Sequence, residues 1–310
     1  MQPPLQAIPT HIITGFLGVG KSTTIQSLLA RKPVNERWAV LVNEFGEIGV
    51  DGALLSSNSD HSGEVFIREV AGGCLCCAAS VPFQVALNQL LKEAQPDRLL
   101  IEPTGLGHPQ QIIRTLLKPE FQSTIDLHAT LTLVDARKLQ DPRYREHPTF
   151  RQQLQIADLV VAHKADLYRG NEVEQLRNYL KSIDQAETPI HCVSNGAVNL
   201  TWLSLPRFSA PPSTDNTAST PHFHTTGWRF TAEESFDFQK ISAILVKINP
   251  FRLKAVLHTN RGPFAFNLID GELTTSPLPA LHESRIEIID PSTAWSETEI
   301  AIGDCLLKTE

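Results

Sequence analysis

The sequence lacks features that would place it among membrane, nucleic-acid-binding or secreted proteins. No run of about 18 consecutive apolar residues, the length that a membrane-spanning helix needs, occurs among its 310 residues. Positive charge is scarce, because 27 Lys and Arg stand against 34 Asp and Glu, giving a net charge of −7. No basic surface for a nucleic acid is therefore expected. No Lys or Arg precedes Lys21, so the positive start of a secretory signal is missing, and we expect a soluble, cytoplasmic protein.

Cysteine is also rare, and its distribution is uneven. Of five cysteines, three lie within four residues, at Cys74, Cys76 and Cys77, directly after two glycines that relax the backbone. An odd, clustered set favours metal binding over a framework of disulfides. Three thiolates suit Zn²⁺, which normally takes four ligands, so one position is left for water or a further side chain. Candidates for that fourth ligand are Glu44, Glu47 and His108. The alternative is that the cysteines are small buried apolar residues.

Apolar patterning predicts an α/β fold over the first two thirds of the chain. Short apolar runs alternate with amphipathic segments, the order typical of βαβ units and a parallel sheet. Strands are expected at residues 8–14, 38–42, 98–101, 129–134, 159–162 and 190–193, and helices at residues 21–31, 81–92, 108–117 and 172–183.

A change of composition divides the chain. Residues 209–220 read SAPPSTDNTAST, which is typical of a linker. Beyond it, a strand at 227–230, a helix at 236–248 and strands at 253–258, 264–269 and 272–276 predict a small α+β domain. We therefore expect a first domain over residues 1–208, a linker over 209–221 and a second domain over 222–310.

Residues 15–22, GFLGVGKS, fit the phosphate-loop pattern G-x-x-x-x-G-K-[ST] between an expected strand and an expected helix. Glycines let successive N–H groups point at phosphate oxygens, and the helix N-terminus adds its positive dipole end. Lys21 is expected to reach the β- and γ-phosphates, and Ser22 to offer its hydroxyl to Mg²⁺. The alternative is an ordinary glycine-rich turn. The residues predicted to bind the phosphates are Gly15, Gly18, Val19, Gly20, Lys21, Ser22 and Thr23.

The segment His163-Lys164-Ala165-Asp166 follows an apolar strand, where open α/β sheets bind ligands. The Asp166 carboxylate can accept two parallel hydrogen bonds, which guanine offers and adenine does not, so the segment favours GTP. Lys164 is expected to lie over the purine. GTPases usually have Asn where His163 stands, which leaves the bracing role of that Asn open. A solvated charged loop is the alternative.

A second acidic segment, Glu102-Pro103-Thr104-Gly105, ends another expected strand. Phosphate-loop enzymes place a carboxylate there, next to Mg²⁺ or its waters, so Glu102 and Lys21 are the predicted catalytic residues. Gly105 is expected to approach the γ-phosphate and to move on hydrolysis. Residues 43–51, NEFGEIGVD, mix acids with glycines, as a mobile loop near metal or nucleotide does.

These motifs together, with LVDA at residues 133–136, resemble the CobW family of metallochaperone GTPases over nearly the whole chain. The GGCLCC segment between the phosphate loop and E-x-x-G is the most specific part. The resemblance implies a phosphate-loop GTPase fold and slow GTP hydrolysis. It also implies zinc or a related metal at Cys74, Cys76 and Cys77, and delivery of that metal to a client protein.

The hypothesis is that GTP and Mg²⁺ order residues 43–51 and 102–107 and thereby change the affinity of the cysteines for metal. Two alternatives stay open. One is an ATP-dependent kinase or ATPase with a structural zinc. The other is a zinc-storage or regulatory protein that holds nucleotide without hydrolysing it. The sequence leaves the client, the oligomeric state and any activating partner undetermined.

Overall fold

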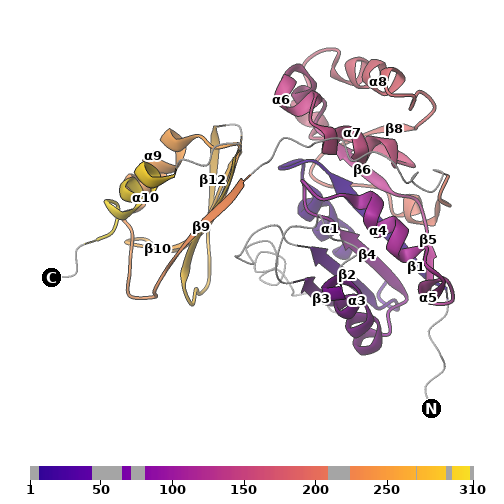
Figure 1. Ribbon diagram of the computed structural model, residues 1–310, viewed down its shortest axis with the longest axis horizontal. Helices are drawn as coiled ribbons and strands as arrows, with labels where there is room; N and C mark the ends of the chain where they lie inside the picture. Colours follow the sequence, from indigo (N-terminus) through magenta and orange to yellow (C-terminus); the bar gives the residue numbers. More distant parts are fainter. Residues whose placement is uncertain are drawn as a thin grey trace. The chain divides into compact units, whose positions relative to one another are not determined.

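The computed structural model describes residues 7–43, 65–70, 81–208, 224–269, 271–290 and 295–307. The chain divides into two compact units, an N-terminal and a C-terminal one, each with its own sheet (Figure 1). Among the described residues, no helix is long and apolar enough to cross a membrane. The expected linker, residues 209–221, lies outside them.

The N-terminal unit is built on a parallel sheet, as the apolar runs predicted. Its main strand order is β3-β2-β4-β1-β6-β7-β8, and β5 pairs with β1 off this path. Every pairing is parallel. The strands are β1 (Ile8–Gly15), β2 (Trp38–Asn43), β3 (Val65–Val70), β4 (Arg98–Glu102), β5 (Ile125–Leu127), β6 (Leu131–Val134), β7 (Leu159–His163) and β8 (Ile190–Val193).

Helices cover both faces of this sheet because its strands are apolar on both sides. Along β1, Ile12 belongs to one core with α3 and α4, whereas Ile13 belongs to the other core with α1. The helices are α1 (Lys21–Leu29), α3 (Val81–Ala94), α4 (Pro109–Leu116), α5 (Pro119–Gln122), α6 (Pro142–Arg145), α7 (Pro148–Gln155) and α8 (Glu172–Ser182). The buried β1 therefore carries the loop that follows it on a rigid base.

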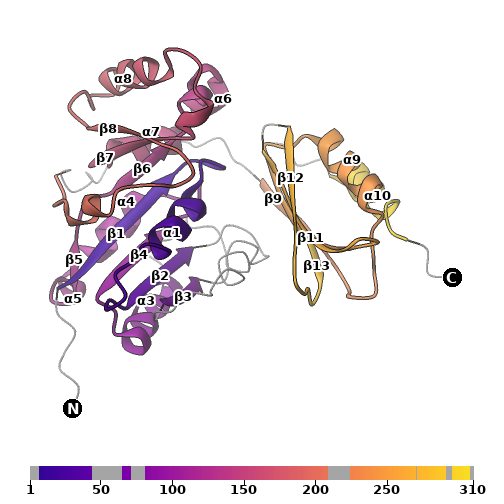
Figure 2. The same cartoon turned by 180° about the vertical axis from the view of Figure 1, so that it is seen from behind.

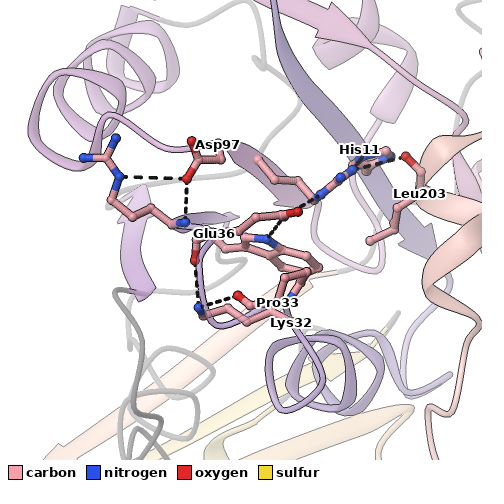
Figure 3. Close-up of polar contacts among 9 residues, drawn as sticks. His11, Lys32, Pro33, Glu36, Asp97 and Leu203 are labelled. Atoms are coloured by element: carbon pink, nitrogen blue, oxygen red, sulfur yellow. Dashed lines mark hydrogen bonds and ion pairs between the residues drawn. The ribbon is translucent and has the colours of Figure 1, made fainter.

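A polar network ties the amino-terminal ends of β2 and β4 together (Figure 3). Glu36 accepts from the indole N–H of Trp38 at 2.6 Å and lies 3.6 Å from the Arg98 guanidinium. Arg98 in turn contacts Nε2 of His11 at 2.9 Å and donates to the Leu203 carbonyl at 3.2 Å. Burial lowers the pKa of His11 well below its ordinary value, and Arg98 and His128 add to that effect. These contacts fix the sheet at the edge away from the loop after β1.

The C-terminal unit is an antiparallel sheet of order β12-β11-β10-β13-β9. Figure 2 shows α9 and α10 on one face of it. Ile241 and Leu245 of α9 and Ile302 of α10 share a core with the strand residues that point to that face. The elements are β9 (His224–Phe230), α9 (Phe238–Ile248), β10 (Arg252–Thr259), β11 (Gly262–Ile269), β12 (Glu272–Pro277), β13 (Ser284–Asp290) and α10 (Ser296–Gly303).

Candidate functional site

The loop between β1 and α1 has the backbone shape of a phosphate cradle. Gly15, Gly18 and Gly20 have φ values of 146°, 69° and 103°, which residues with side chains rarely adopt. At Gly15 a Cβ would also stand 2.5 Å from the backbone oxygen of Leu133 on β6. Gly20 is the N-cap residue of α1, and no side chain caps the helix there. The first N–H groups of α1 thus face the loop, as anion binding requires.

Lys21 is folded over this loop. Its side chain is buried, and Nζ donates to the carbonyl oxygens of Gly15 at 3.0 Å and Phe16 at 3.3 Å. The ammonium is therefore held above the turn that the glycines form. Phosphate oxygens are better acceptors for an ammonium than carbonyls, so an incoming phosphate can take over these hydrogen bonds.

Ser22 and Glu102 meet at the same edge of the sheet. The Ser22 hydroxyl donates to Oε1 of Glu102 at 3.0 Å across 80 residues of sequence, and Glu102 is only 4% exposed. The contact forms because β4 pairs with β1 in parallel, so both strands end beside the loop. A hydroxyl and a carboxylate at hydrogen-bond distance are the oxygen ligands that Mg²⁺ takes in such sites, so the pair fits this ion.

Gly105 packs directly against the phosphate loop. A Cβ on Gly105 would lie 2.5 Å from Cδ2 of Leu17 and 2.8 Å from both its Cα and its backbone N. The carbonyl of Gly105 accepts a 3.0 Å hydrogen bond from Nε2 of Gln153, a fully buried residue of α7. Thr132 on β6 donates to the Gln153 carbonyl at 3.1 Å, so the end of α7 is tied to the sheet. Sequence reasoning did not find Gln153, because nothing near it in sequence marks its role.

The predicted base-binding segment begins at the end of β7. Lys164 has a φ of 59°, and its Nζ lies 3.7 Å from Oδ2 of Asp135, at the end of β6. Asp135 also accepts from Arg137 through Nε at 2.9 Å and the terminal nitrogen at 2.6 Å. The Tyr168 hydroxyl donates to the His163 carbonyl at 2.8 Å and accepts from the Ala136 N–H at 3.1 Å. These contacts hold the segment from beneath and leave Asp166 exposed.

A loop that sequence reasoning missed completes this corner. Residues 194–196 follow β8, which is parallel to β7. The backbone N–H of Asp166 donates to Oγ of Ser194 at 3.0 Å, and that of Gly196 donates to Nε2 of His163 at 2.9 Å. The available signal was Ser-Asn-Gly directly after an apolar strand, which marks a turn at the carboxyl edge of the sheet.

The predicted metal motif belongs to a part of the chain that the structure does not describe. Cys74, Cys76, Cys77, Glu44 and Glu47 lie outside the described residues. Among the described ones, no group of three or more His, Cys, Asp or Glu side chains is arranged to hold a metal ion. His108 is the N-cap residue of α4, and its Nδ1 lies 2.9 Å from Oε1 of Gln152.

The chain is similar to known proteins over most of its length. Residues 9–191 match the family described as CobW/HypB/UreG, nucleotide-binding domain. The chain belongs to this family. It is 37% identical to the zinc chaperone YeiR of Escherichia coli, over 97% of this chain and 98% of that protein. The zinc chaperone YjiA of the same organism is 31% identical over 79% of this chain and 73% of its own length. The zinc chaperone CobW of a Sinorhizobium species is 31% identical over 62% and 60%.

Proposed function

We propose that this chain is a GTPase that binds zinc and delivers it to a client metalloprotein. The observation that carries the proposal is the cradle itself: Lys21 folded over a glycine loop, with Ser22 and Glu102 in contact beside it. The chain also belongs to the CobW/HypB/UreG family, and three of its relatives are named zinc chaperones. We place the protein in the cytoplasm.

Each residue of the phosphate loop has its own role in this proposal. The N–H groups of Gly18, Val19, Gly20 and the first turn of α1, which includes Ser22 and Thr23, bind the phosphates. Lys21 exchanges the carbonyls of Gly15 and Phe16 for β- and γ-phosphate oxygens. Ser22 and Glu102 would hold Mg²⁺, which would supply positive charge to neutralise the phosphates.

Guanine is selected at the far corner of the site. The exposed Asp166 carboxylate accepts from the two adjacent donors of guanine, which adenine does not present. Lys164, steadied by the buried carboxylate of Asp135 at 3.7 Å, lies over the base. Because Ser194 fixes the backbone of Asp166 at 3.0 Å, the carboxylate is held before the base arrives.

Zinc is the cargo, and Cys74, Cys76 and Cys77 are its ligands, with Glu44 a candidate for the fourth position. An open coordination position lets an ion be received and given up. Residues 43–51 and 71–80 follow β2 and β3, which are parallel to β4 and end at the same edge of the sheet as the cradle. These two segments are therefore the ones through which we expect GTP-driven ordering after Glu102 to act on zinc binding. By linkage, zinc then changes GTP affinity by the factor by which GTP changes zinc affinity.

The test measures phosphate release from GTP and from ATP, with zinc content determined on the same samples. We expect release from GTP only, its loss in Lys21→Ala, and retained slow release with reduced zinc in Cys76→Ser. Equal release from ATP would instead favour a kinase or ATPase with a structural zinc. Zinc and GTP binding without any release would favour a storage or regulatory protein.

A further inference from the structure

His163 occupies a position between three parts of the nucleotide site. It is the last residue of β7 and is only 3% exposed. Its ring lies against the phosphate loop, because a Cβ on Gly20 would stand 2.5 Å from the ring Cε1 and 2.8 Å from Nδ1. On its other side, the N–H of Gly196 donates to Nε2 at 2.9 Å. Nδ1, which faces the phosphate loop, has no hydrogen-bond partner among the described residues, so this side of the ring is held by packing.

Gly196 carries the contact on to the start of α1. It is buried, with a φ of 71°, and a Cβ there would stand 2.7 Å from the backbone oxygen of Thr23 and 2.9 Å from Cα of Thr24. The loop 194–196 therefore rests on the first turn of the helix whose N-terminus faces the phosphates. His163 lies between that loop and Gly20, so the ring fills the gap between the two segments.

The hydrogen bond from Gly196 determines which form of the imidazole fits. Nε2 accepts from Gly196, so it carries no proton, and the ring proton is on Nδ1. A doubly protonated ring has no acceptor nitrogen and would set the N–H of Gly196 against another N–H. The neutral imidazole keeps an acceptor for the N–H of Gly196, and the carbonyl oxygen of an asparagine amide could accept the same hydrogen bond.

The groups around the ring shift the pKa of His163 in both directions. Burial lowers the pKa of His163 and is the largest effect, and Lys164 acts in the same direction. The backbone of Val19 and the carboxylates of Asp135 and Asp166 act to raise the pKa. The net pKa lies below the ordinary value, so the ring is neutral at pH 7 and gains a proton as the pH falls.

We propose that His163 is a positioning residue that does not touch the base: its neutral imidazole joins the phosphate loop to the loop 194–196 and holds the cradle in its nucleotide-binding shape. Protonation of the ring breaks the contact with Gly196 and lowers the affinity for the phosphates. The inference rests on the proposed function, because it assumes that this cradle binds a guanine nucleotide.

The test is the affinity for a fluorescent GDP analogue between pH 8 and pH 5. We compare the full-length wild-type protein with the His163→Asn, His163→Ala and His191→Asn variants. His191 lies on the neighbouring β8, is exposed and stacks on Trp202, so its variant is a matched control for loss of a histidine. The phosphates of the nucleotide also titrate in this pH range, but their effect on affinity is the same for all four proteins and cancels in the comparison.

As the pH falls from 8 to 5, we expect the affinity of wild type and of His191→Asn for the GDP analogue to drop roughly tenfold more than that of His163→Asn. The reason is that only these two proteins keep His163 and so lose the buried hydrogen bond with Gly196 on protonation. His163→Asn binds at pH 8 within about threefold of wild type, whereas His163→Ala binds roughly tenfold more weakly at every pH. Parallel profiles for wild type and His163→Asn would overturn the inference while leaving the proposed function in place. No binding by wild type at pH 8 would overturn both.

The ring tautomer gives a readout that needs no variant. In the ¹⁵N spectrum of the labelled wild-type protein at pH 8, we expect an unprotonated Nε2 and a protonated Nδ1 for His163. A protonated Nε2 on His163 would contradict the proposal, even if the Asn and Ala variants failed to fold.

Discussion

Replacing Gly105 by alanine tests whether the segment after β4 works by direct contact with the phosphate loop. The added Cβ would stand 2.8 Å from both the Cα and the backbone N of Leu17, where ordinary contacts begin at 3.4 Å. The two backbones must therefore separate by roughly 0.6 Å, the difference between those two distances. Leu17 is buried, so it has little room to yield.

This separation has two consequences. Inserting one carbon into a well-packed contact costs about 1–3 kcal/mol of folding stability. Moving Gly105 away from the loop also disturbs the 3.0 Å hydrogen bond that its carbonyl accepts from Gln153. If Gly105 has to contact the loop for hydrolysis, a loss of that size slows phosphate release by roughly tenfold or more, at about 1.4 kcal/mol for each factor of ten. GDP affinity changes less, because Lys21 and Ser22 keep their places.

Urea unfolding and phosphate release from GTP, measured on the same preparations, check the prediction. Gly303→Ala is the matched control, because its Cβ would meet nothing within 4 Å and the residue is helical. That variant should be as active as wild type and equally stable or more so by up to about 1 kcal/mol. A Gly105→Ala protein with the stability and turnover of wild type would refute the steric reasoning.

Three further predictions concern other parts of the N-terminal unit. Asp166→Asn should weaken GTP binding by roughly tenfold to a hundredfold and shift preference towards xanthosine triphosphate, measured by competition, since the amide offers a donor where guanine needs a second acceptor. Glu102→Gln keeps an acceptor for Ser22 but removes the charge, so GTP affinity should lose most of its dependence on Mg²⁺ in a magnesium titration; an unchanged dependence would exclude Glu102 as the metal carboxylate. Burial, with a smaller effect of His108, lowers the pKa of His147 from 6.5 to about 4. Because the unfolded chain then takes up the proton first, stability is full above about pH 6.5 and falls by roughly 1.4 kcal/mol per pH unit down to pH 4. His147→Gln should flatten that part of the urea-midpoint profile, and an unchanged slope would show that the acid sensitivity arises elsewhere.

The strands that the sequence predicted are those with continuous apolar runs. The expected runs at 8–14, 38–42, 98–101 and 159–162 became β1, β2, β4 and β7, within one residue at each end. These strands are buried on both faces, so their composition is sufficient to identify them. The α/β class of the first unit is confirmed by its parallel sheet, and the small α+β domain expected after residue 222 is confirmed by an antiparallel sheet with two helices packed on it.

The sequence analysis missed β3, β5 and β13, which all mix charged and apolar residues. Strand β3, VFIREV, is at the edge of the sheet, and its Arg68 donates to Gln89 of α3 rather than joining a core. Strand β13, SRIEIID, alternates charged and apolar residues, because Ile286 and Ile288 face the helices while Glu287 points the other way. That alternation is a strand signal, and the sequence reading overlooked it.

At the candidate site, the local motifs could be predicted from the sequence, but the residues that contact and position them could not. A phosphate loop is specified by eight consecutive residues, so its position could be read directly. The partners Asp135, Gln153 and Gly196 lie 29, 48 and 33 residues from the groups they contact, Lys164, Gly105 and His163. Which of them meet is decided by the order of β1, β6, β7 and β8 in the sheet. Those parallel neighbours are distant in sequence, and a single sequence does not give their order.

The strand order connects the cradle to the strand that precedes the cysteine motif in the sequence. Glu102, which contacts Ser22, pairs in register with Val42 of β2, and the next residue, Asn43, pairs with Val70 at the end of β3. Cys74 follows Val70 by four residues. Two strand pairings, β4 with β2 and β2 with β3, therefore connect Glu102 to Val70. If the coupling between GTP and zinc runs through these pairings, it should weaken when the Ser22–Glu102 contact is removed. Zinc affinity in Ser22→Ala, measured with and without GTP, should then differ by a smaller factor than in wild type, and an equal factor would show that the coupling takes another route.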